Sequence, residues 1–412
     1  MQVETNEERL WNLVETFGKI GEIGDGAMMR VTGSEADGAA RDEVVSRFEA
    51  AGLSVGVDAV GNIVGRRPGI RALDPVMAGS HIDTVPMGGK FDGTAGVLTA
   101  LEAVLALDEA GVETERPIEL VVFTEEEGTR FGKGLLGSLV ATGKLSVEEA
   151  LALEDRDGET LASALDEIGY RGSDDLGLSD AAAFLELHVE QGPILHETGT
   201  PIGIVESVAG ISHHRVTYTG EANHAGNTPM NRRHDAFAGA AEFVVDLEAT
   251  ARSNAERSAT VGTVGSCLVE PNGTNVIPGR AELGVDIRDT DAEVLEATID
   301  AAKTHASEAA ASRGLSVEWQ TLLEVKPTEL SPSIRTELEA ACRANDVGFR
   351  PMVSGAGHDA MNVADVAPTG MIFVPSVDGV SHAPEEYTEP SDLATGAAVL
   401  ASALQRLAND VQ

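Results

Sequence analysis

The chain has 412 residues, of which 68 are acidic and 29 basic, giving a formal net charge of −39 at pH 7. So acidic a protein is not expected to bind nucleic-acid phosphates, and no apolar run approaches the roughly 20 residues of a membrane span. Cys267 and Cys342 are the only cysteines and lie far apart, so neither a disulfide framework nor a thiolate zinc site is expected. Any metal ligands would then be His and carboxylate side chains.

The balance of charge and hydrophobicity indicates a folded protein with an acidic coat. A hydrophobic content of 42% and regular amphipathic stretches favour a packed core over disorder. Residues 1–5 lack the basic start and apolar run of a signal peptide, so we expect a cytoplasmic location. Molar salt screens the repulsion within a dense carboxylate coat, and we therefore expect a halophilic cytoplasm.

Helical and strand patterns alternate along the first part of the chain. The expected helices span 6–19, 36–52 and 95–110, and the expected buried strands span 75–79 and 117–123. This alternation is typical of an α/β domain with a mainly parallel sheet.

The pattern changes near residue 210, after an excursion of short helices and loops expected over 140–182. Two half-buried strands at 215–219 and 280–288 then combine with long amphipathic helices at 234–252 and 291–313. Strands and long helices of this kind predict a separate α+β layer with helices on an antiparallel sheet.

The α/β pattern returns from about residue 326, with a strand at 370–374 and a closing helix at 390–408. A chain of this length is expected to form two domains. We therefore predict a discontinuous α/β domain of residues 1–209 and 326–412, interrupted by an inserted α+β domain of residues 210–325.

The first candidate site directly follows the strand at 75–79. His81 and Asp83 are two residues apart, a spacing that suits a metal-binding imidazole oriented by a carboxylate. Asp92 lies among glycines, which let the backbone approach closely, so Asp92 is a candidate bridge between two ions. The alternative is a polar loop in which Asp92 caps a helix.

Three adjacent carboxylates, Glu125, Glu126 and Glu127, directly follow the strand at 117–123. They repel one another unless a cation lies nearby, and a metal ion is the simplest such cation. Extended backbone would turn successive side chains to opposite sides, so one Glu could bind metal while its neighbour shuttles a proton. The alternative is an exposed acidic turn.

Two further runs supply imidazoles. Residues 186–193 are typical of a strand with polar side chains on one face, and His188 in it is either a metal ligand or a structural residue. Residues 379–385 form a glycine-bounded loop that contains His382. Together the clusters place three His and several carboxylates at strand ends, where open α/β sheets build their sites. This coincidence favours a metal site over the separate structural alternatives.

With these motifs the chain resembles the amidase, hydantoinase and carbamoylase branch of the aminoacylase and carboxypeptidase-like metallohydrolases. The branch includes hydrolases of N-carbamoyl-L-amino acids, allantoate and β-ureidopropionate. The resemblance runs through almost the whole chain, with further matching segments at 223–230, 233–236, 271–278, 286–288 and 354–359. It implies a metal-binding catalytic domain with an inserted lid and dimerisation domain.

The resemblance also implies a cofactor of two divalent metal ions per subunit, which can be Zn, Mn, Co or Ni. It assigns His81 and His188 to one ion, Glu127 and His382 to the other, and makes Asp92 the bridge between them.

Catalytic and substrate-binding roles follow from the same resemblance. Glu126 is implied as the general base, and Asp83 as the partner that orients His81. His224 is implied to reach across a homodimer interface and stabilise the oxyanion, so that each active site is composite. The implied substrate-binding residues are Gln191, Asn275, Arg288, His213 and Gly357.

The expected reaction is hydrolysis of the carbamoyl group of an N-carbamoyl-L-amino acid to the amino acid, ammonia and carbon dioxide. The alternatives are an allantoate amidohydrolase, a β-ureidopropionase, a dipeptidase or aminoacylase, and a metal-free binding module. His213 and His214 stand where allantoate amidohydrolases carry arginine, and Asn227 stands where Thr or Ala follows His-Ala-Gly. Retention of Glu126 beside every expected ligand disfavours the binding module.

Overall fold

The computed structural model describes residues 3–177 and 180–410 and divides into two compact units. The first unit comprises Met1–Glu206, Leu330–Met352 and His358–Gln412. The second unit comprises Ser207–Glu329 and Val353–Gly357. Each unit has its own hydrophobic core.

The first unit is built on the mainly parallel sheet that the sequence predicts. Its centre is formed by neighbouring parallel strands in the order β17-β7-β5-β6. These strands are β5 (Val76–His81), β6 (Ile118–Phe123), β7 (Ala183–Val189) and β17 (Thr369–Val374). All their residues are buried, which explains why β5, β6 and β17 appear in the sequence as largely apolar runs, whereas β7 also carries the buried polar residues Glu186 and His188.

Antiparallel strands extend the sheet on both sides. Beyond β6 lie β4 (Ile63–Arg67) and β3 (Ser54–Val57), and beyond β17 lies β8 (Ile202–Val208), which also pairs with β16 (Phe349–Ser354). A small ladder of β1 (Glu22–Gly24) and β2 (Ala27–Met28) lies apart from this sheet.

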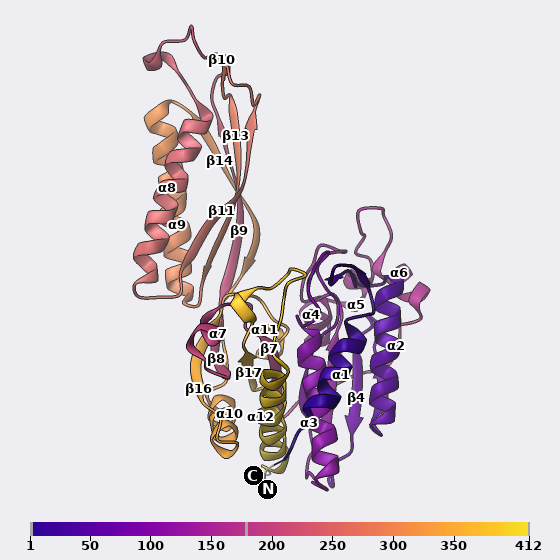
Figure 1. The fold of residues 1–412 in the computed structure, drawn as a ribbon. Helices are drawn as coiled ribbons and strands as arrows, with labels where there is room; N and C mark the ends of the chain where they lie inside the picture. Colours follow the sequence, from indigo (N-terminus) through magenta and orange to yellow (C-terminus); the bar gives the residue numbers. More distant parts are fainter. Residues whose placement is uncertain (1–2, 178–179, 411–412) are drawn as a thin grey trace. The chain divides into compact units, whose positions relative to one another are not determined.

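Helices cover the sheet of the first unit (Figure 1). Helix α3 (Thr94–Glu109) contacts β5, β6 and β7 and is apolar on nearly all sides, as expected of a buried helix. Helices α1 (Glu7–Phe17) and α12 (Pro390–Asn409) pack on α3 and on each other. Further helices of this unit are α2 (Glu35–Ala50), α4 (Leu136–Ala141), α5 (Val147–Leu151), α6 (Leu161–Ile168), α7 (Ile194–Thr198), α10 (Pro332–Ala344), α11 (Ala360–Val363) and the 3-10 turn η3 (Val377–Gly379). Across the described ranges, no helix has both the length and the apolarity to cross a membrane.

The second unit is an antiparallel sheet with two long helices on one face (Figure 1). The strand order is β11 (Val261–Glu270), β13 (Arg280–Asp289), β9 (Gly210–Thr219) and β14 (Ser316–Val325). Helices α8 (Ala236–Ala255) and α9 (Ala292–Arg313) cover the residues of β9 and β13 that alternate as buried. Short elements complete this unit: β10 (Asn223–His224) paired with β12 (Val276–Ile277), η2 (Met230–Arg232), and β15 (Thr328–Glu329) paired with Ser207 and Val208.

Candidate functional site

The predicted metal ligands of the first unit lie at the carboxyl ends of the central strands. His81 ends β5, His188 lies near the end of β7, and His382 follows β17. Because these strands are parallel neighbours, their carboxyl ends meet at one edge of the sheet. The structure forms two groups whose ligand atoms lie within 4.8 Å of one another: His81, Asp92 and His188, and Asp92, Glu127 and His382.

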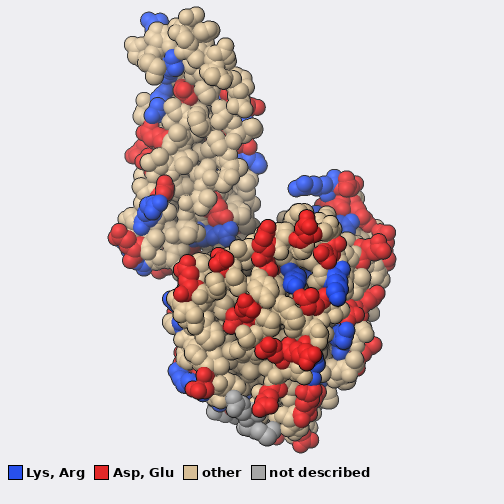
Figure 2. All heavy atoms as spheres, in the orientation of Figure 1, with Lys and Arg blue, Asp and Glu red and all other residues tan. Residues whose placement is uncertain are grey.

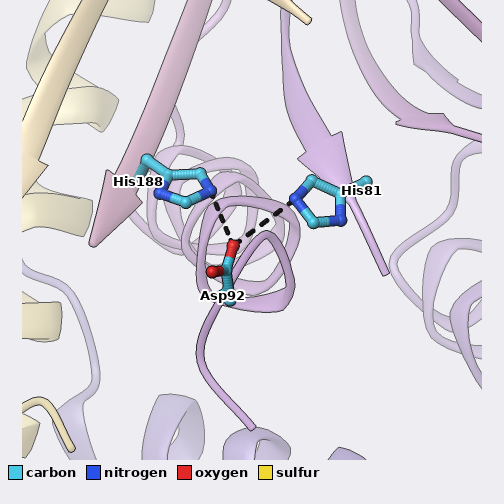
Figure 3. A group of neighbouring side chains, drawn as sticks. All are labelled: His81, Asp92 and His188. Carbon is cyan, nitrogen blue, oxygen red and sulfur yellow. Dashed lines mark ion pairs between the residues drawn. The ribbon is translucent and has the colours of Figure 1, made fainter. Parts of the chain in front are cut away.

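Asp92 belongs to both groups and presents one oxygen to each. Its Oδ1 lies 3.1 Å from Nε2 of His188 and 3.6 Å from Nε2 of His81 (Figure 3). Its Oδ2 lies 3.2 Å from Nε2 of His382, which is 3.5 Å from Oε1 of Glu127. This is the geometry of a carboxylate that can hold two cations at once.

The rings of His81 and His188 are both held through Nδ1 by a backbone carbonyl. Nδ1 of His81 lies 3.1 Å from the Asp83 carbonyl oxygen, and Nδ1 of His188 lies 2.9 Å from the Val189 carbonyl oxygen. A carbonyl oxygen only accepts, so each Nδ1 donates, and in the neutral ring each Nε2 carries its lone pair on the side of Asp92. The backbone N–H of Gly93 donates to Nε2 of His188 at 3.3 Å, which agrees with this tautomer.

Two buried polar atoms at this site lack hydrogen-bond partners among the described residues, as expected of metal ligands. Nε2 of His81 and Oε1 of Glu127 are buried and have no hydrogen-bond partner among the described residues. Such groups are costly to bury unless something satisfies them. One orphan atom belongs to each ligand group, and both are of the nitrogen and oxygen type that divalent metals accept. The residues present therefore fit a two-cation site.

Gly93 shows why glycine is needed beside Asp92. Its φ is +59°, and an added Cβ would lie 2.3 Å from Cε1 and Nε2 of His81. Gly93 is the N-cap residue of α3, and no side chain caps this helix. Asp92 is therefore not the helix cap, and its carboxylate faces the histidines instead. The close approach of backbone to imidazole thus depends on the missing side chain.

The expectation of extended backbone through Glu125–Glu127 is wrong. Glu125 has a φ of +54°, and the segment lies in bends beyond β6. The side chain of Glu125 is buried and accepts the backbone N–H groups of Arg130 and Phe131 at 3.0 and 2.8 Å. A turn, rather than strand alternation, separates this anchoring glutamate from its two neighbours.

Asp83 joins the first cluster to the glutamates. Its Oδ1 and Oδ2 accept the backbone N–H groups of Glu126 and Glu127, each at 3.2 Å. Its carbonyl oxygen holds the His81 ring, while its Oδ1 lies 3.5 Å from Nδ1 of that ring. Oε2 of Glu126 then lies 3.6 Å from Nε2 of His81. Asp83 therefore fixes both His81 and the backbone that presents Glu126 and Glu127.

Burial and crowded charge shift the pKa values of this cluster. Burial raises the pKa of Glu127 to about 7, and the charge of Asp92 adds to the rise. Burial likewise holds the pKa of Glu126 well above its ordinary value. Burial lowers the pKa of His81, but Glu126, Asp83 and Asp92 outweigh it and raise that pKa well above 6.5. Without a cation the cluster retains extra protons, so metal binding should release protons.

Gln191, predicted to bind substrate, lies at the second ligand group. Its Nε2 donates to Oδ2 of Asp92 at 2.8 Å and is 3.5 Å from Nε2 of His382. Its Oε1 is buried and has no hydrogen-bond partner among the described residues, and its φ is +57°. The amide therefore contacts the shared carboxylate directly.

His224 and Asn275, also predicted site residues, are neighbours in the second unit. Nδ1 of His224 accepts the backbone N–H groups of Gly226 and Asn227 at 3.0 and 3.1 Å. Because Nδ1 is an acceptor, the proton of the neutral ring lies on Nε2. The carbonyl of Asn275 accepts the N–H of Ala225 at 2.9 Å, so both side chains lie on one exposed loop pair.

A second cluster in this unit contains the other predicted substrate residues. Arg288 donates to both oxygens of Asp286, with Nε 2.9 Å from Oδ1 and Nη2 2.7 Å from Oδ2, and its Nη1 donates to the Gly355 carbonyl at 2.7 Å. Nε2 of His213 lies 3.2 Å from the same Asp286 oxygen. Gly357 lies in the segment Val353–Gly357, which belongs to this unit.

Several supporting residues were not predicted. Arg30 is fully buried and donates to the carbonyl of Ile82 at 2.9 Å and to Oγ1 of Thr94 at 2.8 Å, bracing both ligand loops. Burial lowers its pKa to about 10, so it remains charged at neutral pH. His358 packs edge-on against His188 with ring centroids 4.5 Å apart. No local motif marks Arg30, because its acceptors are backbone carbonyls and a threonine hydroxyl distant in sequence.

Comparison with known proteins agrees with this architecture. Residues 77–406 match the model of peptidase family M20/M25/M40. The N-carbamoyl-L-amino acid amidohydrolase of Geobacillus stearothermophilus is 41% identical over 411 residues, covering 97% of this chain and 98% of the relative. The allantoate amidohydrolase of Bacillus subtilis (strain 168) is 35% identical over 398 residues, covering 96% of each chain.

A solved structure extends the similarity to the whole fold. The amidase of the hydantoinase/carbamoylase family from Burkholderia multivorans superposes with a TM-score of 0.96 at 39% identity, covering 100% of both chains. Family match, full-length identity and fold agree with the predicted resemblance. This chain therefore belongs to peptidase family M20/M25/M40, as a hydrolase similar to the hydantoinase/carbamoylase amidases that act on C–N amide bonds.

Proposed function

We propose that this enzyme hydrolyses the carbamoyl C–N bond of N-carbamoyl-L-amino acids with two divalent cations bound per subunit. The observation that carries the reaction class is Asp92, which faces both ligand groups while Glu126 lies beside one of them. The ureido substrate is supported by the full-length similarity to a relative named for N-carbamoyl-L-amino acids. Water adds to the ureido carbon, the amino acid leaves, and the carbamate breaks down to ammonia and carbon dioxide.

The two ligand groups assign residues to each cation. His81 and His188 would hold one, Glu127 and His382 the other, and Asp92 both. This nitrogen and oxygen donor set accepts Zn, Mn, Co or Ni. When bound, a pair of such cations lowers the pKa of a shared water and polarises the scissile carbonyl.

Glu126 is proposed as the general base. It takes a proton from the attacking water and delivers it to the leaving nitrogen. Its Oε2 lies 3.6 Å from Nε2 of His81, at the edge of the first ligand group, and its backbone is fixed by Asp83. Since Glu125 is turned away into the protein and Glu127 belongs to the second ligand group, Glu126 is the glutamate left to move protons.

Recognition of the substrate is proposed for Gln191 of the first unit and for four residues of the second unit. Arg288 has the planar fork that pairs with a substrate carboxylate. Asn275 and Gln191 would complete this clamp, with His213 and the Gly357 backbone lining it. The contact of Arg288 with Asp286 holds its side chain in place while Nη1 bonds only a carbonyl oxygen.

His224 is proposed to stabilise the oxyanion at the active site of a second subunit in a homodimer. Its loop is exposed, and its Nδ1 is occupied by two backbone N–H groups, which leaves Nε2–H as a donor. A positioned donor of this kind stabilises charge that develops in the transition state. Each active site would then combine residues of two chains.

The substrate is tested by a panel of N-carbamoyl-L- and D-amino acids, N-carbamoyl-β-alanine, allantoate and dipeptides, scored for ammonia or amino-acid release at high salt. The proposal expects highest kcat/KM on an N-carbamoyl-L-amino acid. Allantoate is the second candidate, because one full-length relative is named for it. Peptide hydrolysis without ureido hydrolysis would overturn the assignment.

The composite site is tested by mixing Glu126→Gln subunits with His224→Ala subunits. Statistical exchange in a symmetric dimer makes about half of the dimers mixed, and each mixed dimer has one intact site, so roughly a quarter of parental sites should return. If His224 acts within its own chain, every site carries one lesion and no activity returns.

We further propose that the enzyme acts in a halophilic cytoplasm. Asp and Glu are spread across the face in Figure 2, in keeping with a net charge of −39. Salt screens the repulsion of such a coat. Unfolding followed at low salt and in molar KCl should show greater stability in KCl, and the opposite order would contradict the proposal.

A further inference from the structure

Glu386 is a buried carboxylate in the first unit, 4% exposed, that joins two ligand loops. Its Oε1 accepts the backbone N–H groups of Phe91 and Asp92, each at 2.9 Å. Its Oε2 accepts the hydroxyl of Ser381 at 2.8 Å. Ser381 directly precedes His382, so one carboxylate ties the loop of Asp92 to the loop of His382.

The connection reaches the shared ligand itself. Oγ of Ser381 lies 3.1 Å from Oδ2 of Asp92, in addition to its contact with Glu386. The Ser381 hydroxyl therefore faces the carboxylates of both Asp92 and Glu386. Any shift of Glu386 would move the Asp92 backbone and the hydroxyl that faces the Asp92 side chain together.

The residues packed around Glu386 leave room for its side chain only because residue 89 is a glycine. A Cβ added at Gly89 would lie 2.5 Å from Cβ and 2.6 Å from Oε1 of Glu386. The next residue, Tyr387, packs edge-on against Phe91, with ring centroids 5.8 Å apart and planes at 86°. Glu386 thus binds the backbone of Phe91 and Asp92 through its carboxylate, while Tyr387 packs its ring against Phe91.

We propose that Glu386 is a positioning residue, which holds Asp92 and the Ser381-His382 segment in the arrangement that binds both cations. This inference rests on the proposed two-cation function. Partners that orient metal ligands commonly contribute about 10–100-fold to metal affinity. A buried carboxylate beside Asp92 is costly in a core, and an apolar side chain could not accept both N–H groups.

The first test uses the full-length protein with its metals removed by a chelator. Hydrogen exchange of the peptide containing Phe91 and Asp92 is compared between the parent, Glu386→Ala and Glu385→Ala. Glu385 is the matched control, because it is the adjacent glutamate and is exposed. Loss of a charge-assisted acceptor should speed exchange in Glu386→Ala by about tenfold or more, whereas Glu385→Ala should match the parent.

The second readout is calorimetric titration with Zn²⁺ and Mn²⁺. Because Asp92 belongs to both ligand groups, Glu386→Ala should lower the affinity for both metal ions bound per subunit, by about 10–100-fold. Glu386→Gln keeps an oxygen that can accept both N–H groups, and it should retain most of the protection and the affinity. A residue that only stabilises the core would lower stability without weakening metal binding in the folded variant.

Gly89→Ala would disturb the contact between Glu386 and the Asp92 loop from the side of that loop. Gly89 does not have a positive φ, so the main penalty of alanine is its collision with Glu386. It should reproduce both effects of Glu386→Ala, while Gly265→Ala, whose Cβ meets nothing within 4 Å, should not. This variant carries the test if Glu386→Ala does not fold.

Exchange rates and affinities equal to those of Glu385→Ala, in folded Glu386→Ala or Gly89→Ala, would overturn the inference. Failure of the proposed function looks different, since the parent itself would then bind no divalent cation or release no amino acid from a ureido substrate. The exchange measurement on metal-free protein still decides the role of Glu386 in that case.

Discussion

Replacement of Gly93 by alanine should damage the candidate metal site from its backbone side. Gly93 has a φ of +59° and a ψ of −50°, and the new Cβ would lie 2.3 Å from two atoms of the His81 ring. With that negative ψ the backbone lies outside the left-handed helical region, and such a rarely populated conformation costs alanine about 1–3 kcal/mol, while displacement of packed atoms adds about 1–3 kcal/mol. We therefore expect the free energy of unfolding to fall by about 2–6 kcal/mol, with weaker metal binding by the His81 group.

The assay is urea unfolding of the metal-free protein, together with metal titration of the folded state. Gly111→Ala is the matched control, because Gly111 follows the other end of α3 with a φ of +65° and an added Cβ meets nothing within 4 Å. It should lose only about 1–2 kcal/mol, the cost of the positive φ alone, and bind metal normally. If Gly93→Ala is as stable as Gly111→Ala and binds metal like the parent, the reasoning about His81 is refuted.

Three further predictions concern single side chains. Glu126→Gln should keep its metals but lose turnover by about 10²–10⁴-fold, because an amide cannot accept the proton, and half of the parental kcat would exclude the role. His81→Ala should lose metal, measured by elemental analysis, and also thermal stability, because bound ions stabilise the folded state; unchanged metal content would contradict its assignment. Burial, with the charges of Lys303 and His213, lowers the pKa of His214 to about 4. Since the unfolded chain binds this proton already near pH 6.5, the free energy of unfolding should be highest above pH 6.5 and fall towards pH 4 by up to about 3 kcal/mol. Urea midpoints that fall equally in His214→Asn would refute that last expectation.

Much of the first unit could be predicted because its central strands are buried on both faces. Strands β5, β6 and β17 appear in the sequence as short apolar runs, and polar residues follow each run at once. The topology of parallel strands then brings His81, Glu127 and His382 to one edge. Edge strands such as β3 and β11 are partly exposed and lack that signal, so they were not predicted.

The sequence by itself determined the donor types, the α/β fold class and the family, because side-chain chemistry and apolar periodicity are local properties of the chain. Tertiary structure alone decided which oxygen of Asp92 faces which histidine, and that Glu125 turns inward at a positive φ. It also decided that Arg30 and Glu386 brace the ligand loops. Most of their partners are backbone N–H and carbonyl groups, which nearly every residue carries, so no sequence pattern distinguishes them until folding brings distant segments into contact.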